Sequence, residues 1–194
     1  MEIKRTESEL LFEQICKKRN IAYKAIEPSV ERTPDYLINI KGMEIVVEVK
    51  QLDPNSDDVE IHNQIISKKK HIFYFPDDKI RVREKIKIAS KQLKRFTEGK
   101  KPGLIVLFDN THGLSGLDRY GILTAMYGDE SIPILVDEKH ELEPIAGPPR
   151  FGGGRRMTEN EKNYISALGI ININNNEPYL YLFHNIFADI AIMM

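Results

Sequence analysis

One predicted β-hairpin constrains the fold more than any other part of the sequence. Two runs with alternating apolar side chains, Tyr36 to Ile40 and Met43 to Lys50, are separated by a two-residue Lys41-Gly42 turn. If the strands fold back at this turn, residues whose numbers sum to 83 face one another. Asp35 then lies directly opposite Glu48.

The hairpin has a polar and an apolar face, because side chains alternate along a strand and opposed residues share a face. Asp35, Glu48 and Lys50 project to the polar face. The other face is wholly apolar and is expected in the core: Tyr36, Ile38, Ile40, Ile45, Val47 and Val49. Opposed carboxylates repel unless a cation joins them, and their oxygens suit Mg²⁺ or Mn²⁺. A polar face in water, with ordinary surface acids, is the alternative.

The composition predicts one globular domain over residues 1–194. Hydrophobic residues make up 41% and charged residues 29%. The longest strongly apolar run, Leu104 to Phe108, is too short to cross a bilayer, and the N-terminus lacks the apolar stretch of a secretion signal. The single cysteine, Cys16, excludes an internal disulfide. A cytoplasmic location and no membrane partner are therefore expected.

Positive charge is concentrated in the middle of the chain, although the formal net charge is only -1. Residues 61–101 hold 13 basic and 4 acidic side chains, whereas residues 1–60 hold 9 and 13 and residues 102–194 hold 6 and 12. A localised excess of this kind is expected of a phosphate-binding face. A solvated lysine-rich helix is the alternative explanation.

Helices and strands are predicted in a definite order around the hairpin. Thr6 and Glu9 have capping-box spacing and predict a helix to about Arg19, and a short strand from Ile21 to Ile26 follows. After the hairpin, a helix over 59–70 and an extended piece over 71–75 are predicted. A helix from Val82 to Thr97 follows, and then a central strand from Gly103 to Asp109, which is apolar without alternation.

The remaining residues, 111–194, are expected to form a peripheral elaboration. It would contain a helix over 117–127, a short strand over 132–136 and a hairpin of strands 164–173 and 179–184. The basic, glycine-rich stretch 147–156 is interpreted either as a mobile loop that clamps a nucleic-acid backbone or as a plain connection.

The strings Pro34-Asp35 and Glu48-Val49-Lys50 resemble the PD-(D/E)XK motif of the restriction-endonuclease-like nuclease superfamily. The order helix, three strands, helix, strand over residues 6–110 is similar to the core of that superfamily. The resemblance implies an α/β fold (an α+β mixed sheet) with a restriction-endonuclease-like αβββαβ core. Residues 111–194 would be its C-terminal elaboration containing a β-hairpin.

The resemblance also implies a metal-dependent nuclease that uses Mg²⁺ or Mn²⁺. Asp35 and Glu48, together with the Val49 carbonyl, would hold the metal. Lys50 would orient or deprotonate the attacking water, or stabilise the pentavalent phosphate. Many members add a glutamate from the first helix, and Glu9 matches that position.

Glu9 has a second explanation, because it also completes the capping box. Glu13 is the alternative to it at the metal site. On a helical wheel Glu9 borders the apolar stripe, whereas Glu13 points more toward water.

Four further residues are predicted to contact nucleic acid. Lys85 and Gln92 lie on the flank of the second long helix, where border residues are also common without any function. Lys91 points further outward, toward the phosphate backbone. Gln51 follows the motif, but by alternation its side chain leaves the catalytic face.

The expected partner is nucleic acid, with DNA favoured over RNA. Relatives that cut both strands are commonly dimers, so the resemblance also allows a homodimer. The alternative function is a catalytically inactive nucleic-acid-binding or protein-interaction module that keeps the same fold.

Overall fold

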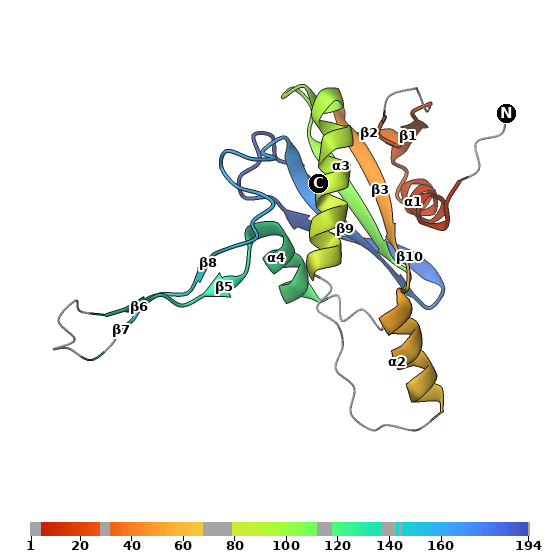
Figure 1. The fold of residues 1–194 in the computed structure, drawn as a ribbon. Coiled ribbons are helices and arrows are strands. Elements are labelled where there is room, and N and C mark those ends of the chain that lie inside the picture. The colour runs from red at the N-terminus through yellow and green to blue at the C-terminus, as the bar shows by residue number, and fades with distance from the viewer. Residues whose placement is uncertain are drawn as a thin grey trace.

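The computed structural model describes residues 5–27, 32–67, 79–111, 118–136, 143 and 145–193. Within these ranges the chain is mixed α/β, with four helices and a six-stranded mixed sheet (Figure 1). The sheet strands, in spatial order, are β1 (Ala22–Ala25), β2 (Tyr36–Ile40), β3 (Met43–Leu52), β4 (Gly103–Asp109), β9 (Ile165–Asn174) and β10 (Glu177–His184). The helices are α1 (Glu7–Lys18), α2 (Ser56–Ile66), α3 (Lys79–Thr97) and α4 (Arg119–Tyr127). None of these helices is long and apolar enough to cross a membrane.

The register of the β2–β3 hairpin is as the sequence predicts. Tyr36 pairs with Val47 and Ile38 with Ile45, so the paired numbers sum to 83. Lys41 and Gly42 both have positive φ, 51° and 86°, which matches the twist of a two-residue hairpin turn. Asp35, one residue before β2, donates its N–H to the Val47 carbonyl at 3.1 Å.

The apolar face of the hairpin is buried under α1. The helix begins at the predicted capping box and directs Phe12 and Ile15 onto Tyr36, Val47 and Val49, in one of two core clusters. Five of the six predicted core side chains on this face are buried, and Ile40 packs at the margin. The alternation along the hairpin therefore predicts this half of the core correctly.

The opposite face of the hairpin is also covered, by α3. Val82, Ile86, Ala89 and Leu93 of this helix are fully buried in the second core cluster, which also contains Val46 of β3. The alternative of a polar hairpin face in water is therefore wrong. Glu48 lies on the α3 face and has no exposed surface.

The C-terminal hairpin belongs to the main sheet. β4 lies between β3 and β9 and is parallel to both, and β10 forms the sheet edge. The turn at Asn175 and Asn176 has positive φ at both residues, and the two strands are close to the predicted ones. The expected peripheral position of residues 111–194 is wrong for this hairpin, because β9 completes the burial of β4.

The other predicted elements differ mainly in their ends. α2 begins after the Asn55 cap, three residues before the predicted helix, because Asn55 and Asp58 form a capping box. The expected extended piece over 71–75 lies outside the described residues. Four two-residue strands replace the predicted strand over 132–136 and loop over 147–156: β5 (Glu130–Ser131), β6 (Ile134–Leu135), β7 (Ile145–Ala146) and β8 (Arg150–Phe151).

The centrality of β4 leads to a stability prediction. Leu107 is fully buried between the sheet and α3, so Leu107→Ala removes apolar contacts and leaves a cavity. We expect a loss of about 2–5 kcal/mol in the free energy of unfolding, measured by urea denaturation. The matched control Leu10→Ala, at a half-exposed position on α1, should change it by less than about 0.5 kcal/mol. Equal losses in both variants would contradict the assignment of the core.

Candidate metal-binding site

The three motif residues lie together where β2 begins and β3 nears its carboxyl end. Asp35 is fixed by its own backbone bond to Val47 and by its Oδ2 atom, which accepts the Val49 N–H at 2.7 Å. Glu48 lies beneath α3, and its Oε1 pairs with the Lys50 Nζ atom. The Lys50 side chain is 22% exposed, so the amine reaches the surface beside a buried acid.

The two carboxylates are unfavourable as anions in this position. Burial, followed by the negative charge of Asp35, raises the pKa of Glu48 from 4.5 to about 8, against the opposing effects of Lys50 and Gln92. Burial also raises the pKa of Asp35, although the Val49 N–H and Lys50 favour its anion. A bound cation would relieve both effects, because it stabilises the charged forms.

An unsatisfied oxygen marks where such a cation could bind. Glu48 Oε2 is buried and accepts no hydrogen bond from any described residue. A buried oxygen of this kind normally has a partner, so a missing ion is one explanation for it. The Val49 carbonyl can add a third oxygen, because its N–H points to Asp35 and the two groups of a strand residue point to the same side.

The resulting donor set is all oxygen and suits Mg²⁺ or Mn²⁺. It has only two side-chain carboxylates: within the described ranges, no group of three His, Cys, Asp or Glu side chains is arranged to hold a metal. Asp35, Glu48 and the Val49 carbonyl are therefore the protein ligands that could hold the ion, with water completing its coordination.

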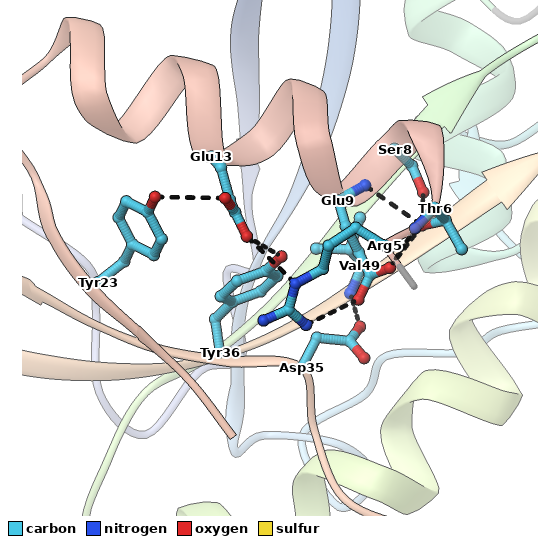
Figure 2. A network of polar contacts seen from close by, with 9 residues as sticks. All are labelled: Arg5, Thr6, Ser8, Glu9, Glu13, Tyr23, Asp35, Tyr36 and Val49. Atoms are coloured by element: carbon cyan, nitrogen blue, oxygen red, sulfur yellow. Dashed lines mark hydrogen bonds and ion pairs between the residues drawn. The ribbon is translucent and has the colours of Figure 1, made fainter. Parts of the chain in front are cut away.

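Figure 2 shows how the first helix faces this site. Glu9 accepts hydrogen bonds from the Thr6 N–H at 2.6 Å and the Thr6 hydroxyl at 2.8 Å, so the capping box is formed. Glu9 is also close enough to raise the pKa of Asp35 through its negative charge. The capping role and the proximity to the acids therefore coexist in one side chain.

Glu13 is bound elsewhere. It accepts the Tyr36 hydroxyl at 2.9 Å and the Tyr23 hydroxyl at 3.3 Å, and it pairs with Arg5 at 3.4 Å. Its side chain is 16% exposed against 14% for Glu9, so the two glutamates are about equally buried and the expected contrast between them is nearly absent. The two tyrosines hold Glu13 over the sheet and away from the Asp35 carboxylate (Figure 2).

Arg5 is a component of this network that the sequence did not single out. Its guanidinium pairs with Glu9 at 3.6 Å and lies 5.5 Å from the centre of the Tyr36 ring. Its positive charge opposes the upward shift in the pKa of Asp35. The i, i+4 spacing of Arg5 and Glu9 is the only sequence signal for this contact.

Of the four residues predicted to contact nucleic acid, two lie beside the motif. Gln92 donates to the Thr33 carbonyl at 3.1 Å and favours the anionic form of Glu48. Lys85 is half-buried, and its pKa is lowered by burial and by the charge of Lys50, with Asp53 acting in the opposite direction. Both side chains therefore come from α3 to the site.

The other two lie apart from the carboxylates. Gln51 accepts the Ser8 N–H at 3.3 Å and donates to Asp53 at 2.6 Å, so its side chain leaves the Glu48 face as alternation predicts. Lys91 is exposed on α3. A direct role for either residue in metal binding is not supported by these positions.

A polar group at the ends of the two central strands was missed by the sequence analysis. Asp53 follows β3 and accepts hydrogen bonds from Gln51 and from Asn110, which follows β4. Arg81 of α3 donates to the Asp53 carbonyl and pairs with buried Asp58 at 3.0 Å. The signal was available, because the carboxyl ends of adjacent parallel strands are a common place for binding groups.

Part of the basic segment is already neutralised within the chain. Arg83 pairs with Asp129 at 2.9 Å, Lys79 with the same carboxylate at 3.1 Å, and Lys87 with Glu84 at 3.4 Å. The charge excess over 61–101 therefore overstates the cations that remain for a phosphate backbone. The site itself contributes Lys50 and Lys85.

Comparison of the chain with protein-family models, curated proteins and solved structures found no match. The function is therefore inferred from the geometry of the site and from the motif.

The raised pKa of Glu48 predicts an unusual pH dependence of stability without metal. The folded protein holds the Glu48 proton up to about pH 8, whereas the unfolded chain releases it near pH 4.5. Folding therefore binds a proton between these values, and the stability from this group is lost as pH rises through them.

We expect the free energy of unfolding in EDTA, relative to Glu48→Gln, to fall by a few kcal/mol from pH 5 to pH 9, since one pKa unit corresponds to about 1.4 kcal/mol. Adding Mn²⁺ at pH 8.5 should stabilise the parent and leave Glu48→Gln unchanged. If the difference in the free energy of unfolding between the parent and Glu48→Gln stays constant with pH, the raised pKa of Glu48 is contradicted.

Proposed function

We propose that this protein is a metal-dependent nuclease that hydrolyses phosphodiester bonds, with DNA as the favoured substrate. The observation that supports this most directly is the buried Glu48 carboxylate beside Asp35, with an unsatisfied oxygen and the Lys50 amine on the same strand. A carboxylate pair with an adjacent amine provides the groups that phosphodiester hydrolysis needs.

The proposal includes the restriction-endonuclease-like fold and a cytoplasmic location. The order α1, β1, β2, β3, α3, β4 is compatible with the αβββαβ core of that superfamily. α2 is then an insertion between the motif strand and the second core helix. The mixed direction of the sheet, antiparallel at β2–β3 and parallel at β3–β4, puts the motif beside the buried central strand.

Asp35, Glu48 and the Val49 carbonyl would bind Mg²⁺ or Mn²⁺, which polarises the scissile phosphate and neutralises developing charge. Ion binding requires Glu48 to release its proton, so occupancy should increase with pH up to about 8. Lys50, which pairs with Glu48 on the same strand, would orient a water or contact a phosphate oxygen.

Residues of α3 would position the substrate. Lys85 lies close enough to Lys50 and Asp53 for their charges to affect it, and it offers a second cation beside the phosphate. Gln92 connects Glu48 to the Thr33 carbonyl just before Asp35, so it keeps the two carboxylates in place. Lys91, exposed on the same helix, would add a contact to the nucleic-acid backbone that is independent of sequence.

The test of the nuclease is hydrolysis of labelled DNA and RNA by the purified chain with Mg²⁺, and again with EDTA. Lys50→Ala should lower the rate at least about 100-fold, because it removes the only motif group that can act on water or the phosphate. Lys24→Ala, an exposed lysine on β1, is the matched control and should keep the parental rate.

Equal rates in Lys50→Ala and the parent would contradict the mechanism. No cleavage by the parent, together with no heat of Mn²⁺ binding in a calorimetric titration, would contradict the proposed function. Mn²⁺ binding that needs both Asp35 and Glu48, with DNA bound and never cut, would favour the inactive binding module instead.

The positions of the two helix glutamates give a separate prediction. Glu9→Gln keeps a hydrogen-bonding cap but removes a charge near Asp35, so Mn²⁺ affinity should fall about 3- to 10-fold in calorimetry. Glu13→Gln should leave Mn²⁺ affinity unchanged. It should lower the free energy of unfolding by about 1 kcal/mol, because the hydroxyls of buried Tyr36 and half-buried Tyr23 lose an ionic acceptor. The reverse pattern would assign the assisting role to Glu13.

A further inference from the structure

A two-stranded arm, described over residues 130–136 and 145–151, extends from the body of the protein beyond α4 (Figure 1). It consists of the β5–β8 and β6–β7 pairs, each only two residues long and with no other strand beside it. An isolated two-stranded ribbon in water is at best marginally stable. The arm therefore needs another surface to stabilise it.

The side chains of the arm indicate an apolar surface. Five of its aliphatic side chains are more than half exposed: Ile132, Ile134, Leu135, Val136 and Ile145. Single exposed apolar residues are ordinary, but a cluster on one projecting element marks an interaction site. Pro133, Pro148 and Pro149 interrupt the strands and lack N–H donors, which disfavours the addition of a partner strand. The contact should therefore be made by side chains.

The charge of the arm argues against a nucleic-acid partner. Residues 130–151 contain five acidic and two basic side chains, a net charge of -3. This stretch would be repelled by phosphates, whereas nucleic-acid-binding surfaces carry excess positive charge. The sequence-based interpretation of residues 147–156 as a nucleic-acid clamp is disfavoured for the same reason. A protein surface fits the arm better.

The base of the arm is firmly anchored. Asp129 pairs with Arg83 of α3 and accepts the Gly152 N–H at 2.6 Å, and its own N–H donates to the Gly153 carbonyl at 2.9 Å. A side chain at Gly128 would approach that carbonyl to 2.7 Å, so the two crossing segments need glycine there. A fixed base with exposed apolar side chains on its projecting strands is suited to reach another molecule.

The same chain offers a matching receptor. A groove of about 600 Å³ lies between α4 and the C-terminal hairpin. We call it the α4 groove; its apolar walls include Ile122, Leu123, Ile170, Tyr181 and Phe183, and its polar residues are Asp118, Arg119, Asn172 and His184. The apolar walls complement the aliphatic side chains of the arm. Arg119 offers a cation to the arm's acidic residues, beside Asp118, which caps α4 by accepting the Gly121 N–H at 2.7 Å.

The arm and the α4 groove are neighbours on one subunit. Tyr127, the last residue of α4, contacts Phe151 of the arm at a ring distance of 5.6 Å and donates its hydroxyl to the carbonyl of His184, at the groove, at 2.9 Å. The arm extends away from the sheet and hence from its own groove (Figure 1). A two-fold axis that crosses the arm between its base and the β6–β7 pair would place each arm in the other subunit's groove and form the contact twice.

We propose that the protein forms a two-fold symmetric dimer in which each subunit's arm occupies the α4 groove of a second copy. This proposal depends on surfaces separate from the Asp35–Glu48 site and stands whether or not the protein is a nuclease.

The test is light scattering after size exclusion, over about 1–100 µM of the full chain. The parent should have twice the chain mass of 22.4 kDa. An arm variant, Ile134→Ser with Leu135→Ser, and a groove variant, Tyr181→Glu, should each weaken the dimer at least about tenfold. All three changes are at exposed positions, and thermal unfolding checks that the variants remain folded. Ile66→Ser, an equally exposed isoleucine on α2, is the control and should remain dimeric.

Mixing the variants identifies which surfaces meet. An arm variant keeps an intact groove and a groove variant keeps an intact arm, so the mixture should form mixed dimers, detected by native mass spectrometry, that neither variant forms with itself. A monomeric parent at 100 µM would overturn the proposal. So would a groove variant that dimerises like the parent, because arms would then pair only with each other.

Discussion

The pairing register of β2 and β3 is the constraint on which the rest of the structure depends. A slip of one residue would turn every side chain of a strand to the other face. Tyr36 and Ile38 would leave the core under α1, and Asp35 would no longer lie beside Glu48. The turn at Lys41 and Gly42 fixes this register, so the same short sequence specifies half of the core and the candidate site.

Most of the stability that the site costs the fold is lost at one carboxylate, that of Glu48. Glu48 is surrounded by protein on the α3 face, with Asp35 beside it and only Lys50 and Gln92 to offset the loss of water. Replacing this acid by an apolar residue would give a simpler core. A buried acid with a raised pKa is typical of a functional site, since it can be stabilised by a ligand that binds when the protein acts.

The sequence predicts the local features of this structure well and the long-range ones poorly. The alternation of apolar side chains predicts the two faces of the hairpin. Their helical spacing predicts α3, and the capping box predicts the start of α1. The sequence could not show that β9 lies beside β4, because strands that are neighbours in the sheet but far apart in the chain leave no periodic signal. The interpretation of residues 111–194 as a peripheral elaboration failed for the β9–β10 hairpin for that reason.

In the candidate site, too, the local features were predictable from the sequence and the long-range ones were not. Asp35, Glu48 and Lys50 come from one hairpin, so counting residues brings them together. Gln92 and Lys85 depend on how α3 crosses the sheet, and Arg5 depends on how the chain enters α1. Glu13 was misjudged because two tyrosines from β1 and β2 draw it inward, a tertiary effect that a helical wheel omits.

The proposed binding of a divalent cation by the paired acids can be tested by a crystal structure of the protein soaked in Mn²⁺. We expect an anomalous-scattering peak beside the Asp35 and Glu48 carboxylates and the Val49 carbonyl, with Lys50 no longer paired with Glu48. No peak at this position, with both acids ordered and Glu48 still paired with Lys50 at pH 8.5, would contradict it.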